Sequence, residues 1–222
     1  MREIKAFLFD LDGVIVDTAK YHYLAWKELA DEMNFVFTEE HNERLKGVSR
    51  MTSLDILLEI GKQTKTQKEK EALATQKNTS YVEFISKMDK TEILPGVEAF
   101  LKETKTKGIK IGLGSASKNA PAILDKIGLT DYFETIVDGN RISEAKPNPE
   151  VFLTGAKDLG CNAEECVVFE DAESGVEAAK RAMMFAVGIG ESTILKQADM
   201  VVKGIHELSV DGLLETINDK TK

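Results

Sequence analysis

The sequence predicts an α/β fold in which helices cover both faces of a parallel sheet and an all-helical domain is inserted into the chain. Short apolar runs alternate with helical segments through the carboxy-terminal half, and this alternation is typical of a buried parallel sheet. Between about residues 19 and 88 the strand-like runs almost disappear, and apolar residues recur at helical spacing. The two patterns together favour a Rossmann-like core that carries a helical cap.

The predicted strands are short and apolar. The first lies close to the amino terminus and contains no polar residue, as expected of a strand in the centre of a sheet. The others are spaced through the second half of the chain, with helical segments between most of them. The predicted strands are Ala6–Phe9, Ile109–Leu113, Thr135–Val137, Val167–Phe169, Phe185–Val187 and Met200–Val202.

Capping residues predict the helices that cover this sheet. Asn119 is expected to cap a helix that stops at Gly128, since glycine readily ends a helix in the left-handed conformation. Pro149 is expected at the first position of the next helix. Ser174 with Glu177 is expected to form the capping box of a third helix.

The inserted segment reads as a set of helices without strands. Two of them are expected to begin at capping signatures, Thr52 with Asp55 and Thr66 with Glu69. The predicted domains are therefore a core of residues 1–17 and 92–222 and a helical cap of residues 18–91. Two further helices are expected at Tyr21–Phe35 and Glu39–Leu45. The long last helix carries an apolar stripe that is interpreted as plain core and consists of Tyr81, Phe84, Ile85 and Met88.

Composition limits the classes of partner. The chain has 222 residues and a formal net charge of -9, which disfavours nucleic acid and anionic membranes as partners. No apolar run reaches the roughly 20 residues needed to cross a bilayer, and no signal-peptide pattern is present, so a cytoplasmic location is expected. Cys161 and Cys166 are expected to be reduced thiols. Nothing suggests a dedicated interface, so a monomer is expected.

Acidic residues follow two of the predicted strands. Asp10 and Asp12 follow the first strand, and Glu170 and Asp171 follow Phe169. Ligands of open parallel sheets bind beyond the carboxyl ends of the strands, so these carboxylates are expected to converge there. They would repel one another without a cation. Oxygen ligands without clustered cysteine or histidine favour Mg²⁺ over zinc.

Two further residues are expected beside these carboxylates. Ser115 follows the second strand and Lys146 lies in a loop before a helix, so both could help to bind a phosphoryl group. Each feature also has an ordinary structural explanation. Asp-x-Asp pairs are common in loops, acids favour helix starts, and a single lysine is usually solvated. Their joint placement after separate strands favours the functional interpretation.

Four motifs, in order along the chain, resemble the signatures of the haloacid-dehalogenase superfamily. They are Phe9-Asp10-Leu11-Asp12-Gly13-Val14, Ser115, Lys146-Pro147 and Glu170-Asp171. The helical insert resembles the cap of that superfamily. Further motifs resemble the β-phosphoglucomutase family within it, and this resemblance runs from Ile4 to about Gly190. These motifs are Asp17-Thr18, Tyr21-His22, Ala25-Trp26-Lys27, Lys46-Gly47-Val48-Ser49-Arg50 and Ser115-Ala116-Ser117-Lys118-Asn119.

The resemblance implies interconversion of β-D-glucose 1-phosphate and glucose 6-phosphate through β-glucose 1,6-bisphosphate, the activating intermediate. It implies that Asp10 is the nucleophile that forms a phospho-aspartate and that Asp12 is the general acid and base. It also implies that Ser115 and Lys146 hold the transferring phosphoryl group. The implied ligands of Mg²⁺ are Asp10, the main-chain carbonyl of Asp12, Glu170 and Asp171.

A second phosphate subsite is also implied by the resemblance. Arg50 of the cap, with Ser117 and Asn119 of the core, matches the residues that hold the distal phosphate. A guanidinium suits this role because it forms two parallel hydrogen bonds with a phosphate. The other implied substrate-binding residues are Lys46, Gly47, Val48 and Ser49 of the cap loop, with Ala116 and Lys118 of the core.

His22 and Thr18 complete the candidate catalytic residues. Without the family, His22 is a histidine on a helix face, for which a structural role is the first explanation. The matched Tyr21-His22 pair implies that His22 assists cap closure and proton transfer at Asp12, and Thr18 belongs to the same matched group.

Two other functions are compatible with parts of the pattern. A haloacid-dehalogenase-type sugar-phosphate phosphatase would share the phospho-aspartate and use water as the acceptor, whereas Arg50 and the run from Ser115 to Asn119 favour a mutase. A regulatory or sugar-phosphate-binding α/β module without enzymatic activity would not require intact carboxylates at both Asp10 and Asp12.

Overall fold

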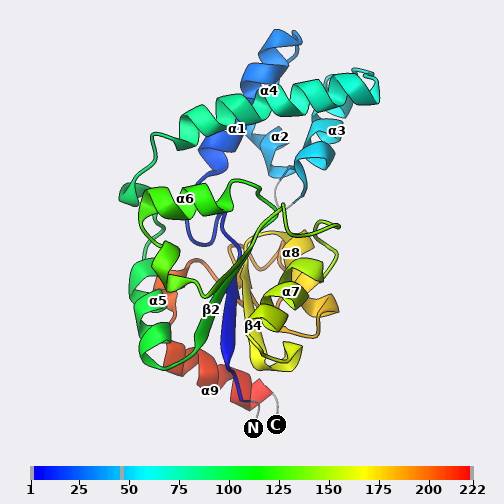
Figure 1. Ribbon diagram of the computed structural model, residues 1–222. Helices are drawn as coiled ribbons and strands as arrows, with labels where there is room; N and C mark the ends of the chain where they lie inside the picture. Colours follow the sequence, from blue (N-terminus) through cyan, green and yellow to red (C-terminus); the bar gives the residue numbers. More distant parts are fainter. Residues whose placement is uncertain (1–2, 46–47, 221–222) are drawn as a thin grey trace.

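The computed structural model describes residues 3–45 and 48–220. Figure 1 shows a sheet flanked by helices in its lower part and a separate layer of helices above the sheet. The chain forms one strand, leaves the sheet for the helical layer and then returns to complete the sheet. The amino-terminal and carboxy-terminal ends of the described chain lie together at the edge of the sheet far from the helical layer (Figure 1). The predicted α/β fold with an inserted helical cap is therefore confirmed.

All strand pairs in the described residues are parallel, and the sheet has the order β3-β2-β1-β4-β5-β6. Strand β1 is central and fully covered, so it can be apolar at every position. Phe9 at its end pairs with Leu113 on one side and Phe169 on the other. The strands are β1 (Ala6–Phe9), β2 (Lys110–Gly114), β3 (Thr135–Val137), β4 (Cys166–Glu170), β5 (Phe185–Ile189) and β6 (Met200–Val202).

Two hydrophobic clusters pack on opposite faces of the sheet, because successive residues of a strand point to opposite sides. Phe7 and Phe9 pack in the cluster that includes residues of α5, α6 and α9. Ala6 and Leu8 pack in the other cluster, with residues of α7 and α8. The helices are α5 (Val97–Thr106), α6 (Ala120–Ile127), α7 (Glu150–Asp158), α8 (Glu173–Arg181) and α9 (Val210–Lys220).

The helical layer has a hydrophobic cluster of its own, which includes Trp26, Leu54 and Leu57. Figure 1 shows this layer above the carboxyl ends of the strands, the place where ligands of parallel sheets bind. The helices of the layer are α1 (Ala19–Glu32), α2 (Glu39–Glu43), α3 (Arg50–Ile60) and α4 (Gln67–Ile85).

Two chain segments connect the helical layer with the sheet, and they lie side by side. Val16 forms a bridge with Ile93, and the backbone N–H of Asp17 donates to the carbonyl of Glu92 over 3.1 Å. The Tyr21 hydroxyl also donates to Glu92, over 2.6 Å. We propose these paired segments as the hinge of a cap domain of residues 18–91, against a core of residues 1–17 and 92–222.

The capping predictions for the cap helices were partly right. Thr66 and Glu69 form the predicted capping box at the start of α4. Helix α3, however, begins earlier than predicted, because Ser49 is extended and its hydroxyl accepts the backbone N–H of Thr52 over 3.2 Å. Thr52 therefore lies inside the first turn, and the predicted start there was wrong.

The capping predictions for the core helices were less accurate. Ser174 and Glu177 do not cap α8, because the side chain of Glu170 accepts the backbone N–H of Ala172 and the helix starts directly afterwards. Pro149 lies just before α7 instead of at its first position. Gly128 ends α6 in the left-handed conformation as predicted, with φ of 71°.

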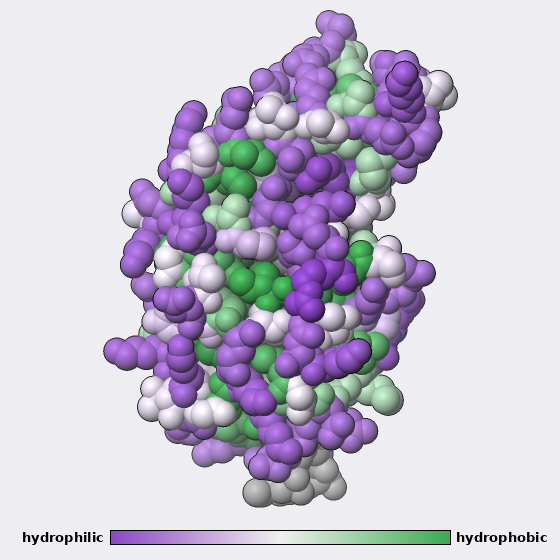
Figure 2. Space-filling view, in the orientation of Figure 1, coloured by the Kyte–Doolittle hydropathy of each residue, from purple (hydrophilic) through white to green (hydrophobic). Residues whose placement is uncertain are grey.

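The face of the molecule seen in Figure 2 is mainly hydrophilic. Figure 2 shows hydrophilic residues over most of the visible face, with a hollow at its edge between the helical layer and the core. Within residues 3–45 and 48–220, no helix combines the length and apolar character needed to cross a membrane.

Candidate active site

Three acidic side chains meet at the carboxyl ends of β1 and β4. Asp10 follows β1, Glu170 ends β4, and Asp171 comes next. The pairing of these two strands brings the residues together, and their carboxylate oxygens lie within 4.8 Å of one another. Asp12 is not part of this carboxylate group, so the structure brings together three of the four predicted carboxylates.

Lys146 balances part of this negative charge. It is 4 % exposed, its Nζ lies 2.5 Å from Asp10 Oδ1, and it also forms an ion pair with Glu170. Burial alone would lower the pKa of Lys146, but the charges of Asp10 and Glu170 outweigh burial and hold the pKa above its ordinary value. Lys146 is therefore a permanent positive charge beside the candidate nucleophile.

The donor set of this group fits Mg²⁺. Asp10, Glu170 and Asp171 provide hard carboxylate oxygens, which Mg²⁺ prefers. The loop after β1 approaches them closely at Gly13, which has φ of +79°, and a side chain there would overlap the carboxylate of Asp171. Only glycine combines this conformation with this close approach. The carbonyl of Asp12 as a further ligand stays a prediction.

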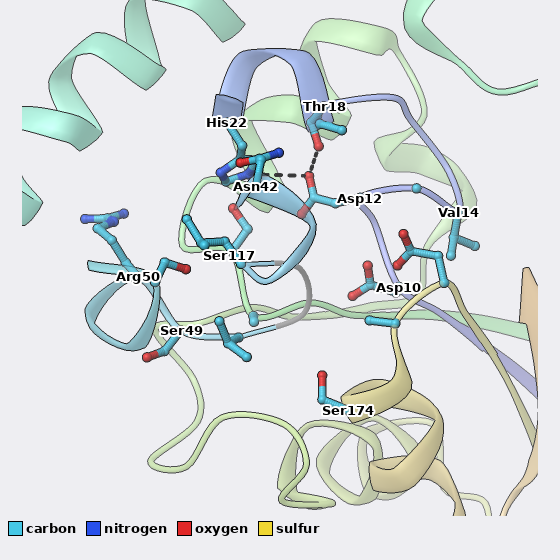
Figure 3. A pocket seen from close by; sticks show the side chains of 18 of the residues that line it. Asp10, Asp12, Val14, Thr18, His22, Asn42, Ser49, Arg50, Ser117 and Ser174 are labelled. Atoms are coloured by element: carbon cyan, nitrogen blue, oxygen red, sulfur yellow. Dashed lines mark hydrogen bonds and ion pairs between the residues drawn. The ribbon is translucent and has the colours of Figure 1, made fainter. Parts of the chain in front are cut away.

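The carboxylate of Asp12 lies apart from this group and faces the first cap helix. Thr18 donates a hydrogen bond to Asp12 Oδ1, and His22 Nε2 lies 3.9 Å from the same oxygen (Figure 3). Burial raises the pKa of Asp12 to about 6, and the negative charge of Asp10 adds to this effect. A group with such a pKa can both accept and donate a proton near neutral pH.

Lys77, on α4, is a buried residue that the sequence interpretation missed. Its Nζ lies 3.1 Å from His22 Nδ1 and over the rings of Trp26 and Tyr81, 4.7 and 4.4 Å from their centroids. Burial lowers the pKa of Lys77 to about 7, and the positive charge of Arg50 contributes to this effect. A signal was available, because Lys77 occupies the apolar face of α4 between Ala74 and Tyr81.

The contact with Lys77 determines how His22 can act. Burial, with the positive charges of Lys77 and Arg50, lowers the pKa of His22 well below its ordinary value. The imidazole is therefore neutral at neutral pH. A charged ammonium group can only donate, so when Lys77 is protonated it donates to Nδ1 and the ring hydrogen is on Nε2, which faces Asp12. Tyr81, predicted as plain core, packs against His22 with ring centroids 4.2 Å apart and the ring planes tilted by 34°, and it lines the cavity.

The loop between β2 and α6 is fixed by its own hydroxyl groups. Ser115 is 1 % exposed, and its Oγ accepts the backbone N–H of Ser117 over 3.1 Å. The Oγ of Ser117 in turn accepts the backbone N–H of Asn119 over 3.2 Å. The side chain of Asn119 does not cap α6 as expected; it bonds to Asn78 of the cap instead.

The cap loop contributes Arg50 to the site. Val48, Ser49 and Arg50 line the cavity, and no carboxylate pairs with Arg50 in the described part of the chain. Burial lowers the pKa of Arg50 from its ordinary value, but an arginine remains charged at any pH of interest. Lys46 and Gly47, predicted from the same motif, lie outside the described residues.

A cavity of about 1320 Å³ separates the cap from the core. Figure 3 shows Arg50 on one side of it, and Asp10 and Asp12 on the other. Ser115, Lys146 and Glu170 are almost fully buried and are not among its lining residues. The predicted residues that line it are Asp10, Asp12, Thr18, His22, Val48, Ser49, Arg50, Ala116, Ser117, Lys118, Asn119 and Asp171.

The fold and the site define the class of protein. It is a capped α/β enzyme in which three carboxylates and a buried lysine meet at the carboxyl ends of the central strands. The sequence profile of the family described as haloacid dehalogenase-like hydrolase matches residues 7–189. The chain belongs to the haloacid dehalogenase-like hydrolase family.

This chain is similar to known proteins in both its sequence and its fold. The chain is 45% identical to a β-phosphoglucomutase of Bacillus subtilis over 96% of its own length and 95% of that protein. It is 32% identical to a phosphorylated carbohydrates phosphatase of Thermotoga maritima, over 81% and 82% of the two chains. A crystal structure of β-phosphoglucomutase from Clostridium difficile superposes with a TM-score of 0.94 at 44% identity, covering 98% of this chain and 99% of that one.

Proposed function

We propose that this protein is a phosphomutase that interconverts β-D-glucose 1-phosphate and glucose 6-phosphate. The observation that carries this proposal is the position of Arg50, a half-buried guanidinium that faces the cavity from the cap. It has no carboxylate partner among the described residues, so an anionic group of the substrate can pair with it. The cavity thus has the candidate nucleophile Asp10, paired with the buried Lys146, on one side and the guanidinium of Arg50 as an anion-binding group on the other. The similarity to β-phosphoglucomutase supports glucose phosphates as the substrates.

In the proposed reaction, Asp10 accepts and returns the phosphoryl group. Its carboxylate oxygen attacks phosphorus, the bond to the sugar oxygen breaks, and an acyl phosphate forms on Asp10. Lys146, 2.5 Å from Asp10, offsets the negative charge that the new phosphate brings. When bound by Asp10, Glu170 and Asp171, Mg²⁺ supplies further positive charge to the transferring phosphoryl oxygens.

Asp12 moves the proton that accompanies each transfer. When a sugar hydroxyl attacks the acyl phosphate, Asp12 accepts its proton; in the reverse step Asp12 returns the proton to the departing sugar oxygen. Thr18 and His22 both face the same oxygen of Asp12. We infer that they hold the carboxylate in place while the cap is open, and that closure of the cap delivers Asp12 to the sugar.

The two subsites explain how one nucleophile can serve both ends of the sugar. The phosphorylated enzyme binds β-D-glucose 1-phosphate with its phosphate at Arg50, Ser117 and Asn119, and the C6 hydroxyl attacks the acyl phosphate. The product, β-glucose 1,6-bisphosphate, rebinds with its ends exchanged, and Asp10 then removes the C1 phosphate to leave glucose 6-phosphate. Arg50 lies on the cap and Ser117 on the core, so a bound phosphate favours closure.

A sugar-phosphate phosphatase is the second candidate function. It shares the acyl phosphate and differs only in the acceptor, which is water instead of a sugar hydroxyl. The similarity to the phosphatase of Thermotoga maritima is the observation in its favour. Arg50 favours the mutase, because a phosphatase of small phosphate esters does not require a second anion-binding end.

A product assay tests the proposal. The protein is incubated with Mg²⁺, β-D-glucose 1-phosphate and a trace of β-glucose 1,6-bisphosphate, and both glucose 6-phosphate and inorganic phosphate are measured. We expect glucose 6-phosphate as the main product. Steady release of inorganic phosphate with little glucose 6-phosphate would establish the phosphatase instead. The α-anomer of glucose 1-phosphate provides the matched control for the anomeric preference.

A further inference from the structure

A side-chain hydrogen bond connects the cap with the core on the distal side of the cavity. The amide Nδ2 of Asn119, at the start of α6, donates to Oδ1 of Asn78 on α4 over 3.0 Å. Both residues line the cavity. The two residues are 41 positions apart in the sequence, so only the packing of the cap over the core brings them together.

The chemistry of the two amides indicates what this contact does. The NH₂ group of Asn119 has two hydrogens, and one of them is donated to Asn78. The second hydrogen remains available to a phosphate, because the charged oxygens of a phosphate accept hydrogen bonds and do not donate them. If the amide turned over, its carbonyl oxygen would face the phosphate and repel it. An acceptor at Asn78 therefore holds Asn119 in the orientation that can bind an anion.

The surroundings of both residues restrict their movement. The backbone of Asn119 is held by Ser117, whose Oγ accepts its N–H over 3.2 Å. Asn78 follows Lys77 on the same helix, and Lys77 is buried against His22 and Trp26. One turn of α4 thus contacts both parts of the site. Asn78 contacts Asn119 at the distal end of the cavity, and Lys77 contacts His22, which faces Asp12.

We propose that Asn78 is a positioning residue for the distal phosphate: it orients the Asn119 amide toward the anion and so connects phosphate binding on the core with the position of the cap. This inference rests on the proposed function, because it requires a substrate with a phosphate at that end. Asn78 itself does not touch the reacting atoms.

Ligand binding tests the inference directly. Trp26, the single tryptophan, lines the cavity and lies under Lys77, so its fluorescence reports binding of glucose 6-phosphate in the presence of Mg²⁺. We expect Asn78→Ala to weaken this binding about tenfold, which equals about 1.4 kcal/mol. The matched control is Thr79→Ala, the next residue of α4, which is exposed. Its dissociation constant should equal that of the wild type.

Two measurements separate positioning from general damage. Acetyl phosphate can phosphorylate Asp10 but is too small to reach Asn119, so Asn78→Ala should leave this labelling rate unchanged. In the Asn119→Ala background, Asn78→Ala should have no further effect on binding, because it acts through Asn119. A slowed labelling rate, or an equal loss of affinity in both backgrounds, would overturn the inference.

The outcomes distinguish this inference from the proposed function. Wild-type protein that converts β-D-glucose 1-phosphate, together with an unchanged dissociation constant in Asn78→Ala, contradicts the positioning role alone. Wild-type protein that binds glucose 6-phosphate through Asn78 without converting the substrate contradicts the mutase alone. Wild-type protein that does not bind glucose 6-phosphate contradicts both.

Discussion

Replacement of Lys77 by methionine should make the protein more stable and less active. Lys77 is 3 % exposed and its pKa is lowered to about 7, so the folded protein binds this proton more weakly than the unfolded chain does. Between pH 7 and 10 the unfolded chain therefore carries more protons at this residue, and the free energy of unfolding of the wild type rises with pH. Lys77→Met removes this dependence of stability on pH, and it also removes the free-energy cost of burying the charged ammonium group.

The expected magnitude follows from the pKa difference. A change from 10.5 to about 7 corresponds to at most about 5 kcal/mol below pH 7, at about 1.4 kcal/mol for each pKa unit. At pH 7, where the folded protein is about half protonated at Lys77, the linkage comes to about 4 kcal/mol. We therefore expect Lys77→Met to be about 4 kcal/mol more stable than the wild type at pH 7, with the difference falling below about 1 kcal/mol near pH 10.

Urea unfolding at several pH values between 7 and 10 measures this difference. Lys68→Met is the control, because Lys68 lies on the same helix and is exposed; it should follow the wild type at every pH. A constant difference between Lys77→Met and the wild type across this range would refute the argument from burial. We also expect Lys77→Met to lower mutase turnover, since Nδ1 of His22 loses its donor.

Four further substitutions test the active site. Asp10→Asn should abolish acyl-phosphate labelling by acetyl phosphate and leave the circular dichroism spectrum unchanged; retained labelling would exclude Asp10 as the nucleophile. Asp12→Asn should reduce kcat by about 10² to 10⁴ while Mg²⁺ binding, measured by calorimetry, is retained, and full activity would contradict its role as proton carrier. Arg50→Ala should raise KM by about tenfold or more, because hydrogen bonds to charged groups contribute about 1.5–3 kcal/mol; an unchanged KM would argue against a second subsite. Gly13→Ala should weaken Mg²⁺ binding, since its methyl group overlaps Asp171, and unchanged metal affinity would contradict that close approach.

Local sequence signals located most elements of the fold but not all of their ends. The capping box at Thr66 was read correctly, because both of its partners lie within one turn of the chain. The start of α8 was misread at Ser174, because a buried carboxylate, Glu170, organises the preceding turn. That carboxylate is fixed by its ion pair with Lys146, which no local pattern reveals.

The sequence also identified most of the candidate site, for a reason of topology. Asp10 and Glu170 were expected together because parallel strands end at the same edge of a sheet, and the structure pairs their strands directly. Asp12 was expected in the same carboxylate group, but Thr18 and His22 hold its side chain toward the cap. The position of Asp12 three residues after the end of β1 does not determine the direction of its side chain, which depends on contacts with the cap.

By itself the sequence determined the α/β class, the inserted helices and the residues available for phosphoryl transfer, since strand period, helix period and motif order are local properties of the chain. The tertiary structure alone decided that Lys77 lies buried beside His22 and that Asn78 meets Asn119 across the cavity. Burial and distance depend on how the cap packs over the core, and these two quantities set the pKa of a lysine and the orientation of an amide.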